Sequence, residues 1–127
     1  MGIFTTNKPV AFIFTRDREK LKPFYRDVLG LTQLYEDPFG TTFALGDGAT
    51  MRLTTIADHT PGMHTVLGWQ VADIKATIKA LKEKGVAPVI YPGFGQDDLG
   101  IWHAPDGKAK VAWFLDPEGN NLSITSS

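Results

Sequence analysis

Two side chains in this sequence have the chemistry to hold or transform a small molecule. Arg52 lies in the strand-like run ATMRLTT (residues 49–55), and a guanidinium on an apolar surface could clamp a carboxylate or phosphate through two parallel hydrogen bonds. An internal acid such as Glu36 or Asp37 could equally neutralise it, because buried charges are usually paired within the protein. His103 could act as a general base or donate to an anion. The sequence shows no acid partner for it, which favours a partly exposed histidine at a strand end.

Two further segments limit the chemistry. FLDPEGNNLSI (residues 114–124) is an apolar run, a turn, and a strand in which Ser123 alternates with apolar neighbours. No Ser-His-Asp order and no pair of catalytic carboxylates with usable spacing accompanies it. GFGQDDLG (residues 93–100) is not a phosphate-binding loop, because no helix follows the glycines and the two acids would repel phosphate. It is either a mobile loop over a cavity mouth or an ordinary surface loop.

Composition excludes several classes of function. The 127 residues suit one domain, and 43% of them are hydrophobic, which argues against disorder. A formal net charge of −1 leaves no basic surplus for nucleic acid. The absence of cysteine rules out disulfides, thiolate metal sites and a thiol nucleophile. We see no apolar stretch that suggests a membrane span or a signal peptide, so the cytoplasm is the expected compartment.

The first half of the chain predicts a strand, a helix and two further strands. An apolar run over residues 9–17 precedes a helical face that begins at about Leu21–Pro23 and ends at Gly30. Strand-like runs over residues 41–46 and 49–55 follow, joined by the hairpin signal Asp47-Gly48.

The second half repeats this order. A strand over residues 64–73 leads into a helix over about 74–84, with Asp73 as its N-cap and Gly85 as its stop. The remaining predicted strands cover residues 87–92, 100–105, 110–116 and 121–125. Asp17 and Asp73, like Gly30 and Gly85, occupy matching places in the two halves. A duplicated βαβββ module is therefore predicted, with modules at about residues 8–57 and 64–126 and a linker at 58–63.

This pattern resembles the vicinal oxygen chelate superfamily, which contains glyoxalases, bleomycin-resistance proteins and ring-cleaving dioxygenases. The resemblance is carried by FTRDREKLKPFYRDVLGL (residues 14–31), VADIKATIKALKEKGV (71–86) and FLDPEGNNLSI (114–124). It implies a single α+β domain, residues 1–127, in which two βαβββ modules form an open barrel around a ligand cavity. It also implies a homodimer, because pairing often completes that cavity.

The resemblance further implies four positions that hold a divalent metal in metal-using relatives. Here they correspond to Val10, Arg52, Val66 and Ser123, none of which is a competent ligand for such an ion. His64 shares the face of Val66 by strand alternation and could supply one metal ligand in its place. A single imidazole does not make a metal site. We therefore expect no metal and no other cofactor.

By the same analogy, the expected ligand site contains Arg52, Phe12, Phe14, Gln70 and Ser123. Arg52 would place a positive charge among apolar side chains, where an anionic ligand or an internal carboxylate must meet it. The predicted function is metal-independent binding of an apolar or aromatic, anionic small molecule. The alternative is a glyoxalase-like lyase, isomerase or dioxygenase, either metal-free with His103 or a cavity carboxylate as acid–base, or metal-dependent. The tryptophans are predicted as core or interface residues, of which one or two could stack on a planar ligand.

Overall fold

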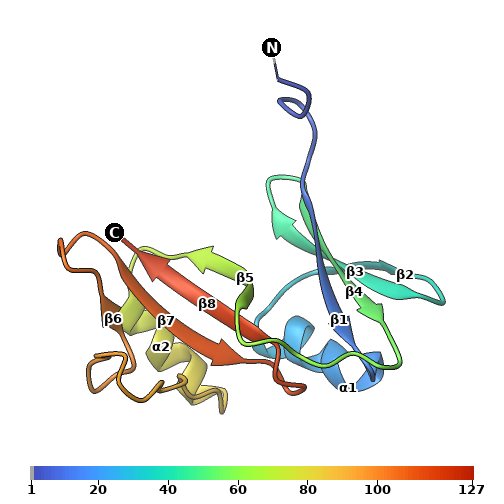
Figure 1. Ribbon diagram of the computed structural model, residues 1–127. Coiled ribbons are helices and arrows are strands. Elements are labelled where there is room, and N and C mark those ends of the chain that lie inside the picture. The colour runs from blue at the N-terminus through green and yellow to red at the C-terminus, as the bar shows by residue number, and fades with distance from the viewer. Residues whose placement is uncertain (1) are drawn as a thin grey trace. The chain divides into compact units, whose positions relative to one another are not determined.

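The computed structural model describes residues 2–127, which contain two four-stranded sheets, each with its own helix (Figure 1). The chain divides into two compact units, one ending at Thr60 and the other spanning Pro61–Ser127. Each unit runs strand, helix, then three strands, so the predicted duplication of a βαβββ module is confirmed. None of the helices in the described part of the chain has the length and apolar character needed to span a membrane.

The first unit forms a mixed sheet in the order β1-β4-β3-β2. Its strands are β1 (Val10–Thr15), β2 (Gln33–Glu36), β3 (Gly40–Gly46) and β4 (Ala49–Thr55). β1 runs parallel to β4, and the other neighbours are antiparallel. The turn between β3 and β4 has positive φ at both central residues, 52° at Asp47 and 82° at Gly48. This is the hairpin geometry that the Asp-Gly pair predicts.

The helix of the first unit begins earlier than the sequence suggested. α1 (Arg18–Pro23) starts directly after Asp17, whose side chain accepts the Lys20 N–H at 3.3 Å. A π-helical segment, η1 (Phe24–Val28), continues it. Pro23 therefore does not open the helix but ends its α-helical part, since proline has no N–H for the i−4 carbonyl. The aspartate cap outweighs the proline signal.

One face of the first sheet is packed and the other is open. Ile13 on β1 is buried, together with Leu21 and Tyr25 from the helical segment and Met51 on β4. The alternate residues of β1 point to the other face and are exposed: Val10, Phe12 and Phe14. Since helices cover only the first face, large apolar side chains remain in water on the second.

The second unit repeats the topology, with strand order β5-β8-β7-β6. Its elements are β5 (Thr65–Gln70), α2 (Ile74–Glu83), β6 (Trp102–His103), β7 (Lys110–Leu115) and β8 (Asn121–Ser126). The Asp73 side chain caps α2 by accepting the Ala76 N–H at 3.1 Å. Gly85 has a φ of +85° after the helix, so both predicted helix signals are confirmed.

One predicted strand of this unit is absent and two are shortened, of which the strand expected at residues 64–73 covers only Thr65–Gln70. Residues 87–92 form no strand, although the Val89 N–H donates to the Trp113 carbonyl at 2.8 Å. Pro88 and Pro92 have no N–H with which to extend that single contact into a ladder. The strand expected at residues 100–105 is reduced to Trp102–His103.

Candidate functional site

The turn before β8 is built around the carboxylate of Asp116. One of its oxygens accepts the backbone N–H groups of Glu118, Gly119 and Asn120 at 2.9–3.0 Å. The other accepts the side-chain amide of Asn120 at 2.7 Å. Gly119 adopts a φ of +102°, which disfavours any other residue. The DPEGN motif therefore determines where β8 starts and how its side chains alternate.

Ser123 lies on β8 opposite Gly68 of β5 and Trp113 of β7. Its exposed fraction is 7%. A Cβ atom on Gly68 would come within 2.5 Å of the Ser123 Oγ, so the glycine makes room for the serine. Gln70 lies on an exposed part of β5, opposite Thr125.

Arg52 is paired within the first unit. Its Nη2 donates to both oxygens of Asp37, at 2.7 and 2.8 Å. Nη1 has only a 3.5 Å contact with the Thr42 hydroxyl. The Arg52 guanidinium, with the backbone N–H groups of Phe39 and Gly40, lowers the pKa of Asp37 to about 2. Of the two acids that the sequence offered as partners for Arg52, Asp37 is the one that pairs with it. The positive charge of Arg52 is therefore compensated within the protein.

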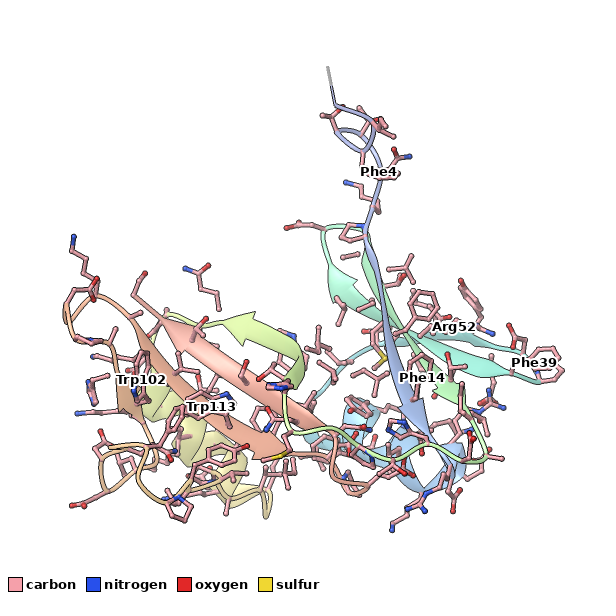
Figure 2. All side chains as sticks on the ribbon, viewed as in Figure 1. Phe4, Phe14, Phe39, Arg52, Trp102 and Trp113 are labelled. Atoms are coloured by element: carbon pink, nitrogen blue, oxygen red, sulfur yellow. The ribbon has the colours of Figure 1, made fainter. Side chains whose placement is uncertain are left out.

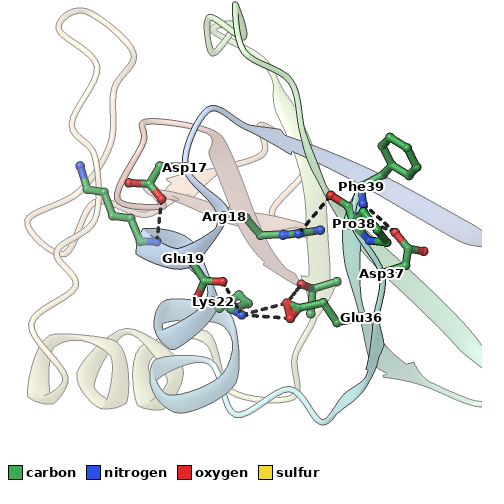
Figure 3. A network of polar contacts seen from close by, with 11 residues as sticks. Asp17, Arg18, Glu19, Lys22, Glu36, Asp37, Pro38 and Phe39 are labelled. Carbon is green, nitrogen blue, oxygen red and sulfur yellow. Dashed lines mark hydrogen bonds and ion pairs between the residues drawn. The ribbon is translucent and has the colours of Figure 1, made fainter.

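Glu36, the other acid proposed for Arg52, belongs to a separate network (Figure 3). It binds the Lys22 ammonium at 2.8 Å and accepts the Thr41 hydroxyl at 2.7 Å. Lys22 also contacts Glu19 at 2.9 Å. The Lys22 hydrogen bond, followed by that from Thr41, lowers the pKa of Glu36. The two neighbouring acids at the end of β2 thus pair with different cations, Glu36 with Lys22 and Asp37 with Arg52.

The Arg52 side chain shares a sheet face with the exposed apolar residues of β1. Phe12 is the register partner of Arg52, and Phe14 lies two residues further along the strand. Figure 2 shows Arg52 and Phe14 on these neighbouring strands. The exposed fractions are 53% for Phe12 and 38% for Phe14. The structure therefore brings Arg52, Phe12 and Phe14 together, as expected from the sequence.

The donor set at the four metal-corresponding positions does not fit a divalent ion. In the first unit, Val10 and Arg52 supply a hydrocarbon and a paired cation. In the second unit, Val66 and Ser123 supply a hydrocarbon and a hydroxyl. Residues 2–127 contain no group of three or more His, Cys, Asp or Glu side chains that could hold a metal. His64 lies in a bend before β5, so strand alternation does not assign it to the face of Val66.

His103 has an acid partner that the sequence did not reveal. Its Nε2 lies 2.9 Å from an Asp97 oxygen. Burial raises the pKa of Asp97, but the hydrogen bonds from His103 and from the N–H groups of Ile101 and Leu99 outweigh it, and the pKa is lowered overall. The register of β6 and β7 places His103 on the face opposite Trp102. This pair could hold a proton, but it faces away from Ser123.

Four aromatic rings gather on the Ser123 face of the second unit. Phe94 contacts Tyr91, Trp102 and Trp113, with ring centroids 6.0, 6.5 and 5.5 Å apart. Tyr91 also packs edge-on against Trp113 at 5.7 Å. Trp69 instead stacks on Phe114, away from this aromatic cluster. The sequence did not single out Tyr91 or Phe94, because Tyr91 falls in the segment 87–92 that was predicted as a strand and Phe94 in the glycine-rich loop that follows it.

A polar chain supports the aromatic cluster. The Asn121 side-chain amide donates to the Tyr91 hydroxyl, and the Asn121 oxygen accepts the Thr65 hydroxyl at 2.9 Å. The Gln96 side chain accepts the Tyr91 N–H at 2.7 Å and donates to the carbonyls of Val89 and Gly100, at 2.9 and 2.8 Å. Tyr91 is therefore held at both its backbone and its hydroxyl group.

Comparison with known proteins identifies the family. The family model described as Glyoxalase/Bleomycin resistance protein/Dioxygenase superfamily matches residues 7–124. None of the curated proteins compared with the sequence matches it.

A solved superfamily member from Sphaerobacter thermophilus DSM 20745 is 24% identical, with a TM-score of 0.75 over 98% of this chain and 100% of that one. TnmS3, an antibiotic binding protein from Streptomyces sp. CB03234, is 24% identical, with a TM-score of 0.72 over 95% of each chain. A glyoxalase family protein from Enterococcus faecalis is 17% identical, with a TM-score of 0.74 over 97% of this chain and 99% of that one. The duplicated fold and this match over nearly the whole chain show that the protein belongs to the glyoxalase/bleomycin resistance protein/dioxygenase superfamily.

Proposed function

We propose that this protein binds a small, apolar or aromatic, anionic molecule without a metal. The observation that carries the proposal is the exposed face of β1 and β4, where Phe12 and Phe14 lie beside Arg52. Exposed apolar side chains that are contiguous on one face are typical of a binding surface. The four metal-corresponding positions supply no carboxylate or imidazole, which supports binding without a metal.

Arg52 can still anchor an anion while it is paired. Both short bonds of the guanidinium use Nη2, and Nη1 makes only the long contact with Thr42. The side chain is 22% exposed, so water or a ligand reaches it. A carboxylate could bind at Nη1 without displacing Asp37, because a guanidinium has five donors.

The solved antibiotic binding protein of similar fold supports a small-molecule ligand.

We further propose that the protein is a homodimer, because large apolar side chains of both units remain exposed and most soluble oligomers are symmetric. Light scattering at micromolar concentration should then give twice the 13.9 kDa chain mass; a single-chain mass contradicts the dimer. The cytoplasmic location stays a prediction from the sequence.

The ligand proposal is tested by binding of 2-naphthoate, an aromatic carboxylate, measured by isothermal titration calorimetry. Arg52→Gln should weaken binding about tenfold or more, as expected for the loss of a charge-assisted hydrogen bond. Arg26→Gln is the matched control, since the exposed Arg26 side chain pairs with its neighbour Asp27 on η1 and makes no contact with Arg52 or Asp37. Stoichiometric divalent metal in protein purified without chelator, or no effect of Arg52→Gln on a measurable affinity, would overturn the proposal.

A further inference from the structure

The chain contains two exposed Asp-Gly turns that differ in how their reactive groups are held. Asp47-Gly48 joins β3 to β4, and Asp106-Gly107 lies in the loop between β6 and β7. We infer that Asp47 is a site of spontaneous isomerisation to isoaspartate in the folded protein, whereas Asp106 is protected from it. The modification site lies within the hairpin of the first unit and does not depend on the ligand proposed above.

The reaction needs only water and the two residues of the turn. The backbone nitrogen of Gly48 attacks Cγ of the protonated Asp47 carboxyl group, forming an N–Cγ bond, while a carboxyl oxygen leaves as water with the amide proton. The product is a succinimide ring. Water then cleaves one of the two bonds between the ring nitrogen and a carbonyl carbon. Cleavage at Cγ restores aspartate, whereas cleavage at the α-carbonyl carbon leaves the chain linked through Cγ, as isoaspartate with a free α-carboxylate.

The fold requires glycine at the position that supplies the attacking nitrogen. Gly48 has a φ of +82°, in the left-handed region that side chains disfavour. A Cβ there would also lie 2.9 Å from Cδ of Lys8, whose stem fills the adjoining space. Figure 1 shows this turn beside the segment that leads into β1. A side chain at this position would crowd the nitrogen and slow ring closure, so glycine keeps the turn reactive.

The reacting groups of Asp47 and Gly48 are free to approach each other. Within residues 2–127, the Asp47 carboxylate has no hydrogen bond or ion pair, and the Gly48 N–H donates to no acceptor. The last ladder pair before the turn is Gly46 with Ala49. Both turn residues therefore lie beyond the ladder and can change conformation without breaking its hydrogen bonds. Asp47 itself has a φ of 52°, which is strained for an L-residue.

The same groups of the second Asp-Gly turn are both held. The Asp106 carboxylate accepts the Lys108 N–H at 2.9 Å. The Gly107 N–H donates to the Ala104 carbonyl, also at 2.9 Å. The nitrogen and the carboxyl group must each give up a hydrogen bond before they can meet, which raises the barrier to ring closure. The two turns have the same reactive pair and comparable exposure, so the difference in reactivity comes from these two bonds.

Isomerisation would lengthen the turn between β3 and β4. The isoaspartyl linkage adds the Cβ methylene to the main chain of a two-residue turn whose geometry matches the twist of its strands. The ladder pairs nearest the turn are Gly46 with Ala49 and Ala44 with Thr50. We expect these pairs to open first, so the backbone amides of residues 44–50 should exchange hydrogen faster in the modified protein.

The test is incubation of the folded protein for several weeks at neutral pH and physiological temperature. Isoaspartate is then labelled with a protein isoaspartate O-methyltransferase and tritiated S-adenosylmethionine, and located by peptide mapping. Label at Asp47 should exceed label at Asp106 about tenfold or more, because two hydrogen bonds protect the second turn. In urea-unfolded protein the two turns should react at similar rates, since the fold supplies the protection.

A matched pair of variants locates the reaction. Asp47→Glu should abolish the label of the folded protein, because glutamate would have to close a larger, less favourable ring. Asp106→Glu should leave that label unchanged. Absence of label at Asp47 in the folded wild-type protein, or equal label at Asp47 and Asp106, would overturn the assignment. Circular dichroism of each sample establishes that the incubated protein is folded.

Discussion

Replacement of Asp116 should destabilise the second unit through the turn that positions β8. The carboxylate is 4% exposed and accepts three backbone N–H groups and one side-chain amide. Asp116→Ala removes all four acceptor contacts at once. Two of the donors belong to Asn120, which is 2% exposed, and each buried donor that loses its acceptor costs about 1–3 kcal/mol. The other two amides are partly buried and can be hydrated. We therefore expect a loss of about 3 kcal/mol in the free energy of unfolding.

Asp116→Asn divides this cost into its parts. The remaining carbonyl oxygen can still accept the three backbone N–H groups, but the new amide faces the Asn120 side-chain amide, donor against donor. We expect a loss of about 1–2 kcal/mol. In an Asn120→Ala background the opposing donor is absent, so the same substitution should cost about 1 kcal/mol less, and that difference is the coupling energy of the two side chains.

The assay is equilibrium unfolding in urea, followed by tryptophan fluorescence. All three tryptophans lie in the second unit, with Asp116, so the signal reports on the unit that is changed. For an m-value of about 2 kcal/mol per molar, the Asp116→Ala midpoint should fall by about 1.5 M. An unchanged midpoint, or an Asp116→Asn cost that is identical in both backgrounds, would refute the assignment of the turn's stability to these hydrogen bonds.

Three further predictions concern charge and backbone. The pKa of Asp37 is about 2, below its ordinary 3.8, so the ionised carboxylate favours the folded state. This stabilisation should be complete above about pH 4 and disappear as the pH falls toward 2. Asp37→Asn should remove this part of the pH dependence of the free energy of unfolding. Gly40→Ala would place a Cβ 2.9 Å from the Arg52 Cζ, so the guanidinium should shift away from Asp37. The pKa of Asp37, followed by NMR, should then rise toward its ordinary value. An unchanged pKa would contradict the predicted shift of the guanidinium. The Cβ added by Gly85→Ala meets no atom within 4 Å, but the residue keeps a φ of +85°. Thermal unfolding should therefore show a loss of about 1 kcal/mol in the free energy of unfolding, from backbone strain alone. An equal or higher stability would count against strain at this position.

Local signals were sufficient for most of the fold. Asp73 and Gly85 delimit α2, and Asp47-Gly48 forms the turn between β3 and β4, because caps and turns are satisfied by neighbouring backbone groups. The duplicated order of elements followed from those signals and from strand alternation. Prolines were less informative: Pro23 ends the α-helical part of a helix that Asp17 had already begun. Pro88 and Pro92 lie in a segment that its apolar residues made look like a strand.

For the candidate site, the sequence by itself determined which residues are present and which faces of the strands they occupy. Strand alternation placed Phe12 and Phe14 on one face, and the family resemblance predicted that the metal-corresponding positions are Val10, Arg52, Val66 and Ser123. Only the tertiary structure decided the partners: Arg52 meets Asp37 while Glu36 meets Lys22, and His103 meets Asp97. The physical reason is that ion pairs and ring contacts form across space, between segments whose approach depends on the whole sheet. Several acids are chemically equivalent along the chain, and only the register of the strands and the path of the loop bring one of them within hydrogen-bonding distance.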